Sequence, residues 1–94
     1  MSDNKKKIVV LARRDHIEAM RVAAGLTIFG HDLRVIFMDR PVSQETAQSE
    51  YAELLELADI MPETTVAEMA DNLPLLDTKK LFEAISNADG VINL

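Results

Sequence analysis

The chain has 94 residues, a formal net charge of −6 and no cysteine. Its length predicts one domain over residues 1–94. The negative charge argues against nucleic-acid binding, and the lack of cysteine excludes disulfides and thiolate chemistry. No apolar stretch approaches the roughly 18–20 residues of a membrane span, and no signal peptide is visible, so we expect a cytoplasmic protein without membrane partners.

The first predicted elements are a strand and a helix. Ile8–Leu11 is a continuous apolar run, typical of a strand that is covered on both faces. Asp15 followed by Glu18 has the spacing of a capping box, which predicts a helix from about His16 to Phe29. Helical spacing assigns four residues to its sheet-facing stripe: Ile17, Met20, Ala24 and Ile28.

The second half of this helix, Val22–Phe29, is apolar nearly all round. Such a helix is usually buried on two sides. Its second side is covered either by another subunit or by another helix of the same chain. Ala23 and Gly25 would let another subunit approach closely. The sequence leaves both alternatives open.

Gly30 stands where a helix ends on a residue with positive φ, and the apolar run Leu33–Met38 predicts a second strand. Two strands joined by a single helix run parallel, and their crossover is expected to be right-handed.

A second helix is expected over about Gln44 to Ala58, with Ser43 as its N-cap. The segment after Pro62 is harder to interpret. Thr64–Ala67 has the composition of a short third strand, whereas Ala67–Leu73 is equally compatible with a helical turn.

Asp77 or Thr78 is expected to cap a last helix over about Lys79 to Asn87, and Val91–Leu94 predicts a closing strand. The predicted inward face of this helix consists of Leu81, Phe82, Ile85 and Ala88. Together these elements predict an α/β fold, specifically a three-layer α/β/α sandwich with a small parallel sheet of about four strands.

Two parts of the chain resemble the DsrE/DsrF-like family. The first is KIVVLARRDHIEAMRVAAGLTIFGHDLRVIFM, with its basic-then-apolar strand, its alanine-rich helix and Gly30-His31 before the second strand. The second is the ending Ala88–Leu94, which is similar to the closing strand of that family. The resemblance implies a small α/β fold and assembly into homo- or hetero-oligomers.

Several members of that family act in sulfur relay through a loop cysteine. This chain has none, and it is shortened between the second helix and the last strand. The resemblance therefore implies a non-carrier subunit that is accessory to sulfur relay. From the apolar Val22–Phe29 segment and the missing nucleophile, we expect an oligomeric protein–protein partner rather than an enzyme, and we expect no cofactor.

Candidate ligand-binding residues follow the two predicted strands of the first unit: Arg13, Arg14, His16, Asp39 and Arg40. Ligands of parallel α/β sheets bind beyond the carboxyl ends of the strands. Arginines beside a helix N-terminus can hold an anion, although ion pairs with nearby carboxylates are the simpler explanation. An anion-binding or small-ligand module, or an enzyme, is therefore the alternative function.

No catalytic or metal site is predicted. His16 and His31 lack companions at metal-ligand spacing, and no nucleophile with a supporting base accompanies His16. Four methionines are expected to fill the core, with contact to a hydrophobic partner as their alternative role: Met20, Met38, Met61 and Met69.

Overall fold

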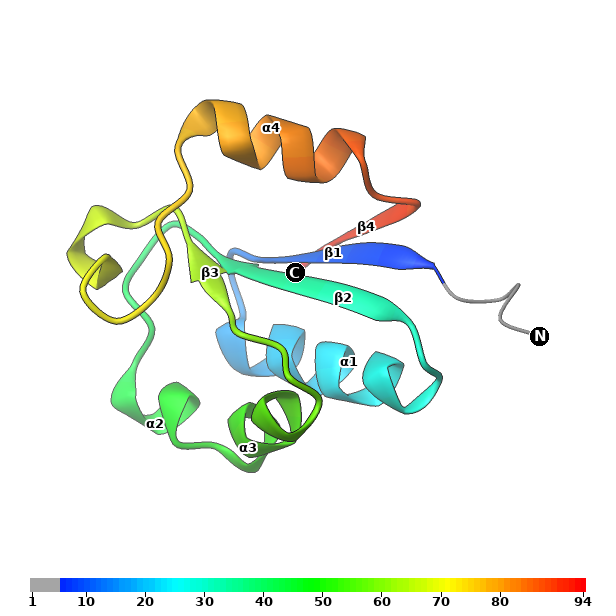
Figure 1. Cartoon of the computed structure of the whole chain (residues 1–94). Helices are drawn as coiled ribbons and strands as arrows, with labels where there is room; N and C mark the ends of the chain where they lie inside the picture. Colours follow the sequence, from blue (N-terminus) through cyan, green and yellow to red (C-terminus); the bar gives the residue numbers. More distant parts are fainter. Residues whose placement is uncertain (1–5) are drawn as a thin grey trace.

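The computed structural model describes residues 6–94 as a four-stranded, all-parallel sheet covered by helices on both faces (Figure 1). The strands are β1 (Lys7–Ala12), β2 (Asp32–Phe37), β3 (Glu63–Thr64) and β4 (Gly90–Asn93). The helices are α1 (His16–Ile28), α2 (Gln44–Ala47), α3 (Glu50–Leu57) and α4 (Thr78–Ser86), with a 3₁₀ turn η1 (Ala67–Met69). The expected three-layer α/β/α architecture is confirmed.

The order of the strands, β3-β2-β1-β4, explains which face each helix covers. The chain steps in one direction from β1 through β2 to β3 and then returns to the other side of β1. Crossovers of one hand therefore put α1 and α3 on one face and α4 on the opposite face, which is the arrangement seen in Figure 1. β1 is the central strand, pairing with β2 from Lys7↔Asp32 to Ala12↔Phe37 and with β4 from Ile8↔Gly90 onward.

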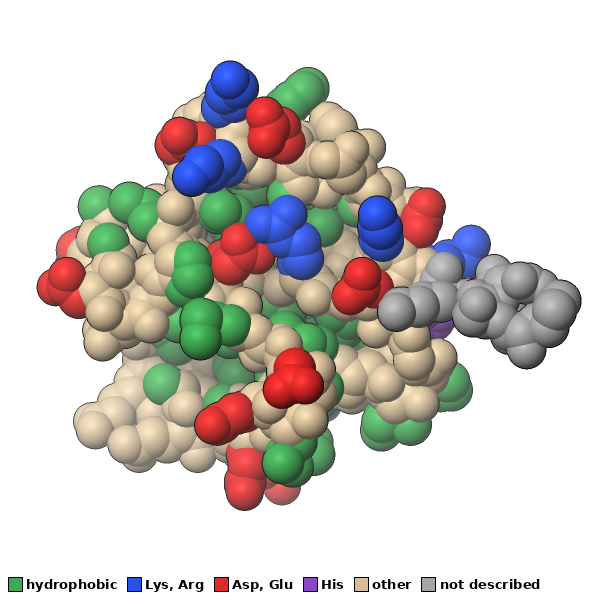
Figure 2. Space-filling view, viewed as in Figure 1, with side chains coloured by type: hydrophobic (Ala, Val, Ile, Leu, Met, Phe, Trp, Pro, Cys, Tyr) green, Lys and Arg blue, Asp and Glu red, His purple; other side chains and the backbone are tan. Residues whose placement is uncertain are grey.

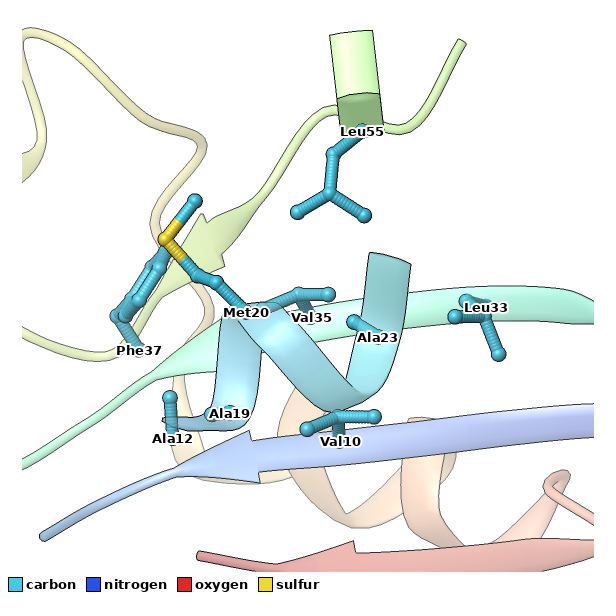
Figure 3. Packing of buried hydrophobic residues seen from close by; sticks show 9 residues of the cluster. All are labelled: Val10, Ala12, Ala19, Met20, Ala23, Leu33, Val35, Phe37 and Leu55. Atoms are coloured by element: carbon cyan, nitrogen blue, oxygen red, sulfur yellow. The ribbon is translucent and has the colours of Figure 1, made fainter. Parts of the chain in front are cut away.

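Successive side chains of each strand point to opposite faces of the sheet, so the strands contribute to two separate hydrophobic clusters, one on each face. On the face covered by α1 and α3, the buried cluster consists of Val10, Ala12, Ala19, Met20, Ala23, Leu33, Val35, Phe37 and Leu55 (Figure 3). On the face covered by α4 it consists of Val9, Leu11, Ile36, Leu76 and Ala84. In Figure 3, Leu55 points from α3 toward α1 and the sheet, so it links the two helices of that layer.

Helix α1 begins and ends as expected, but its buried face is rotated from the predicted stripe. Asp15 caps the helix by accepting a hydrogen bond from the Glu18 amide at 3.0 Å, and Gly30 has φ +79° after its end. The buried residues are His16, Ala19, Met20, Ala23 and Ala24, whereas Ile17 and Ile28 are exposed. Three small alanines let the helix lie close to the sheet, and Ala23 therefore faces the core rather than a neighbouring subunit.

The single helix predicted over Gln44–Ala58 is two helices, because a second cap interrupts it. Ser43 accepts a hydrogen bond from the Thr46 amide, and Ser49 accepts one from the Ala52 amide at 3.4 Å. Each serine thus satisfies an unpaired donor at a helix start. The signal was present in the sequence: Ser49 is followed by the acidic first turn of α3, Glu50 and Glu53.

The segment after α3 contains a two-residue strand, β3, and the turn η1. Of the predicted strand Thr64–Ala67, only Thr64 belongs to β3, whereas the predicted helical turn in Ala67–Leu73 is present as η1. Helix α4 is capped by Asp77, which accepts from the Lys80 amide at 2.8 Å. Its predicted inward face was wrong at Phe82, which is 70% exposed, while Ala84 is the buried residue. Within residues 6–94, no helix combines the length and the apolar character needed to cross a membrane.

Candidate functional site

The five candidate residues lie at one edge of the sheet, where β1 and β2 end. Arg13, Arg14 and His16 belong to the β1–α1 connection, and Asp39 and Arg40 to the β2–α2 connection. Because β1 and β2 pair in parallel register up to Ala12↔Phe37, these two connections leave the sheet side by side. The polar groups of this edge are mostly bonded to one another.

Arg40 ties the two connections together. Its guanidinium donates to the carbonyl oxygens of Arg13 at 3.0 Å and of Arg14 at 2.7 Å. Asp39 has φ 72°, a left-handed conformation that Asp tolerates better than most residues, and it turns the chain back over the end of β1. The same carboxylate pairs with Arg13 at 3.5 Å. Both arginines are thus used within the protein.

His16 is buried, with 4% of its surface exposed. Its Nε2 lies 3.2 Å from the carbonyl oxygen of Met38, and since a carbonyl only accepts, this nitrogen carries the proton. The ring packs edge-on against Phe37, with centroids 5.0 Å apart. Burial away from water lowers the pKa of His16, and the nearby Arg40 charge lowers it further, against opposing contributions from the Met38 hydrogen bond and from Asp39 and Asp15. The imidazole therefore acts as a neutral structural link rather than an exposed base.

The start of α1 offers little room for an anion. The Asp15 carboxylate accepts from the Glu18 amide, and the amides of Arg14 and Asp15 donate to the Leu94 carbonyl oxygen at 3.1 and 3.0 Å. Among the candidates, only the Arg14 guanidinium forms no hydrogen bond or ion pair within residues 6–94, and this side chain is exposed. In the described part of the chain, no three His, Asp or Glu side chains converge as metal ligands.

A large apolar cavity lies next to this edge, between the β2–α2 connection, α3 and the η1 segment. Its volume is about 820 Å³. Its lining residues are Met20, Phe37, Val42, Gln44, Ala47, Ala52, Glu56, Asp59, Ile60, Met61, Pro62, Met69, Asn72 and Leu73. On the left of Figure 2, hydrophobic side chains gather at the recess between the η1 segment and α2. Phe37 connects the cavity to the strand-end edge, but none of the five candidates lines it.

Sequence reasoning missed this cavity for a specific reason. Half of its wall comes from residues 59–73, the segment with no readable periodicity. Three of the four methionines assigned to the core, Met20, Met61 and Met69, line the cavity together. The assignment to the core was right for Met20, at 2% exposure, and wrong for Met61, at 68%. Only the folded chain brings them to one place, because they belong to α1, to the α3–β3 connection and to η1.

The outer side of the α1–α3 layer carries a second unexpected feature. Ile28 is 81% exposed, Phe29 76% and Leu57 77%. Ile28 and Phe29 lie at the end of α1 and Leu57 at the end of α3, and these two helices cover the same face of the sheet (Figure 1). Helix α3 covers part of the apolar Val22–Phe29 segment, since Leu26 packs on the buried cluster, but leaves its end uncovered.

Comparison of the chain with protein-family models, with curated proteins and with solved structures finds no match in any of the three. The resemblance to the DsrE/DsrF-like family therefore remains a prediction, and the function is argued from the geometry above.

Proposed function

We propose that this protein is a non-catalytic subunit of an oligomer that works through protein–protein contacts on the outer side of the α1–α3 layer. The observation that carries the proposal is the exposure of Ile28, Phe29 and Leu57 at the ends of the two helices of that layer. Burying side chains of this size stabilises an association by about 1.5–3 kcal/mol each, before the cost of ordering is subtracted.

The state of the strand-end edge favours this proposal over the alternative of an anion-binding module or enzyme. A ligand bound there would compete with the two carbonyl oxygens for the Arg40 guanidinium and with Asp39 for Arg13. His16 would have to leave its buried contact with Phe37 to reach a substrate. A protein–protein role requires none of these contacts to break.

The resemblance to the DsrE/DsrF-like family supports the same proposal and adds a context. A cysteine-free chain of this kind would be accessory to sulfur relay, contributing surface to an assembly whose partner carries the sulfur. The partner would be a second copy of the chain or another member of the family.

The test is the molar mass in solution by size-exclusion chromatography with light scattering at micromolar concentration. The expected result is an oligomer that Phe29→Ser weakens. Phe82→Ser is the matched control, because Phe82 has a similar exposure, 70% against 76%, but lies on α4 on the opposite face. A monomer under these conditions, or equal weakening by both variants, would contradict the proposal.

A further inference from the structure

We propose that the cavity beside Phe37 binds a small amphiphile with an apolar body and a cationic head. This site is distinct from the surface proposed for assembly, and the inference does not depend on that proposal. It rests on the size of the cavity, the chemistry of its wall and the sign of the charges at its edge.

The size and the wall fit a small apolar body. Pockets for small molecules measure about 300–1,000 Å³ and are lined mainly by hydrophobic side chains with a few polar groups. This cavity, of about 820 Å³, is in that range, and ten of its fourteen lining residues are apolar. Phe37 and Met20, both 2% exposed, belong to the buried cluster of the α1–α3 layer and give the cavity a rigid floor (Figure 3).

The opposite wall is built to adapt. Met61 and Met69 contribute unbranched, polarisable side chains that adjust to ligands of different shape. They lie on the α3–β3 connection and on the single turn η1, outside the long strands of the sheet. A rigid floor facing a compliant wall suits a ligand defined by its apolar volume more than by its hydrogen bonds.

The charges decide the head group. The charged residues that line the cavity are Glu56 and Asp59, both carboxylates, and no lysine or arginine of residues 6–94 lines it. The cations of the adjacent strand-end edge do not line the cavity: Arg13 and Arg40 are bonded within that edge, and the Arg14 side chain is exposed there. An alkylammonium head would find two acceptors of opposite charge, with the amides Gln44 and Asn72 close by. A carboxylate head would meet like charge.

The inference is tested with three probes of one chain length: octylammonium, octanol and octanoate. The protein carries ¹³C in its methionine methyl groups, and each probe is titrated at pH 7 while the methyl signals are followed by NMR. We expect shifts at Met20, Met61 and Met69, with octylammonium binding about tenfold more tightly than octanoate and octanol in between. Met38 is the internal control, because it packs on the α4 face.

Variants locate the effect. Glu56→Gln with Asp59→Asn should abolish the preference for octylammonium over octanoate and leave octanol binding unchanged. Asn is chosen because Asp59 has φ 61°, a conformation that Asn adopts readily. Glu53→Gln on the exposed side of α3 is the matched control and should change nothing. Ala47→Leu, which narrows the cavity, should weaken all three probes.

Three outcomes would overturn the inference. One is equal binding of octylammonium and octanoate by the unmodified protein. Another is the absence of shifts at the three lining methionines with any probe. The third is a shift of these signals with protein concentration alone, which would mean that a second copy of the chain fills the cavity.

Discussion

The two faces of the sheet differ in how completely the chain covers them. The α1–α3 face buries nine residues in its cluster and the α4 face buries five, because two crossovers pass over the first face and one over the second. Yet the better-filled face also holds the large cavity and the exposed Ile28, Phe29 and Leu57. The difference indicates that the α1–α3 layer contains more apolar surface than this fold of the chain needs for itself, and that layer is where we locate both proposals.

Of the substitutions that compare the two faces, Phe37→Ala should lower the free energy of unfolding most. Phe37 is 2% exposed and contacts His16 on one side and the cavity on the other. Removing a buried Phe ring costs about 3–5 kcal/mol of the free energy of unfolding, measured by urea denaturation. Leu76→Ala on the α4 face, where Leu76 is 8% exposed, should cost less. A larger loss for Leu76→Ala would mean that the α4 face carries more of the stability.

Val10→Ala and Val9→Ala make a sharper pair, because the two valines are neighbours on β1 and point to opposite faces. Both are almost fully buried, at 0% and 2% exposure. Each should cost about 2 kcal/mol, from two lost methylene equivalents plus a residual cavity. Val10→Ala should lower the free energy of unfolding more than Val9→Ala. The single helix α4 can shift to fill the space left by Val9 more easily than the two-helix layer can fill the space left by Val10. If urea denaturation gives equal losses of stability for the two variants, the two faces do not differ in how well they fill the space.

The helix caps should have smaller effects. Asp15→Ala on α1 and Asp77→Ala on α4 each remove an acceptor for a backbone amide, which costs about 1 kcal/mol. Asn at either position retains an acceptor and should restore most of the loss. Thermal unfolding followed by circular dichroism measures both. If Asn behaves like Ala, the hydrogen bond is not what stabilises the helix start.

The pH dependence from His16 should be the smallest effect. Burial lowers the pKa of His16 in the folded state, so the unfolded chain binds this proton first as the pH falls below about 6.5. The contribution of His16 to the free energy of unfolding should be fully present above that pH, and it should decrease as the pH falls toward the lower pKa of His16 in the folded state. His16→Gln retains a donor for the Met38 carbonyl but does not titrate, and it should flatten the dependence between pH 7 and 5.5. An unchanged slope would assign it to other groups.

The sequence predicted the elements well wherever a local signal marks them. Ile8–Leu11 and Leu33–Met38 are parallel strands, α1 ends one residue from its predicted end, and Asp15, Ser43 and Asp77 are caps. It failed where two signals compete. Ser49 starts a new helix inside an otherwise continuous helical pattern, and residues 59–73, on both sides of β3, have no readable periodicity.

For the candidate site, the sequence placed Arg13, Arg14, His16, Asp39 and Arg40 at one edge, and the structure has them there. It could not predict that Arg40 would bond two carbonyl oxygens, that His16 would be buried, or that a cavity would open beside Phe37.

The sequence by itself determined the kinds of element, their starts and the parallel direction of the strands, because capping, turns and apolar runs depend on residues close together in the chain. Only the tertiary structure decided which side of α1 faces the sheet, which apolar side chains remain uncovered and which polar groups bond one another. Exposure depends on what packs above a residue, and that neighbour comes from a distant part of the chain.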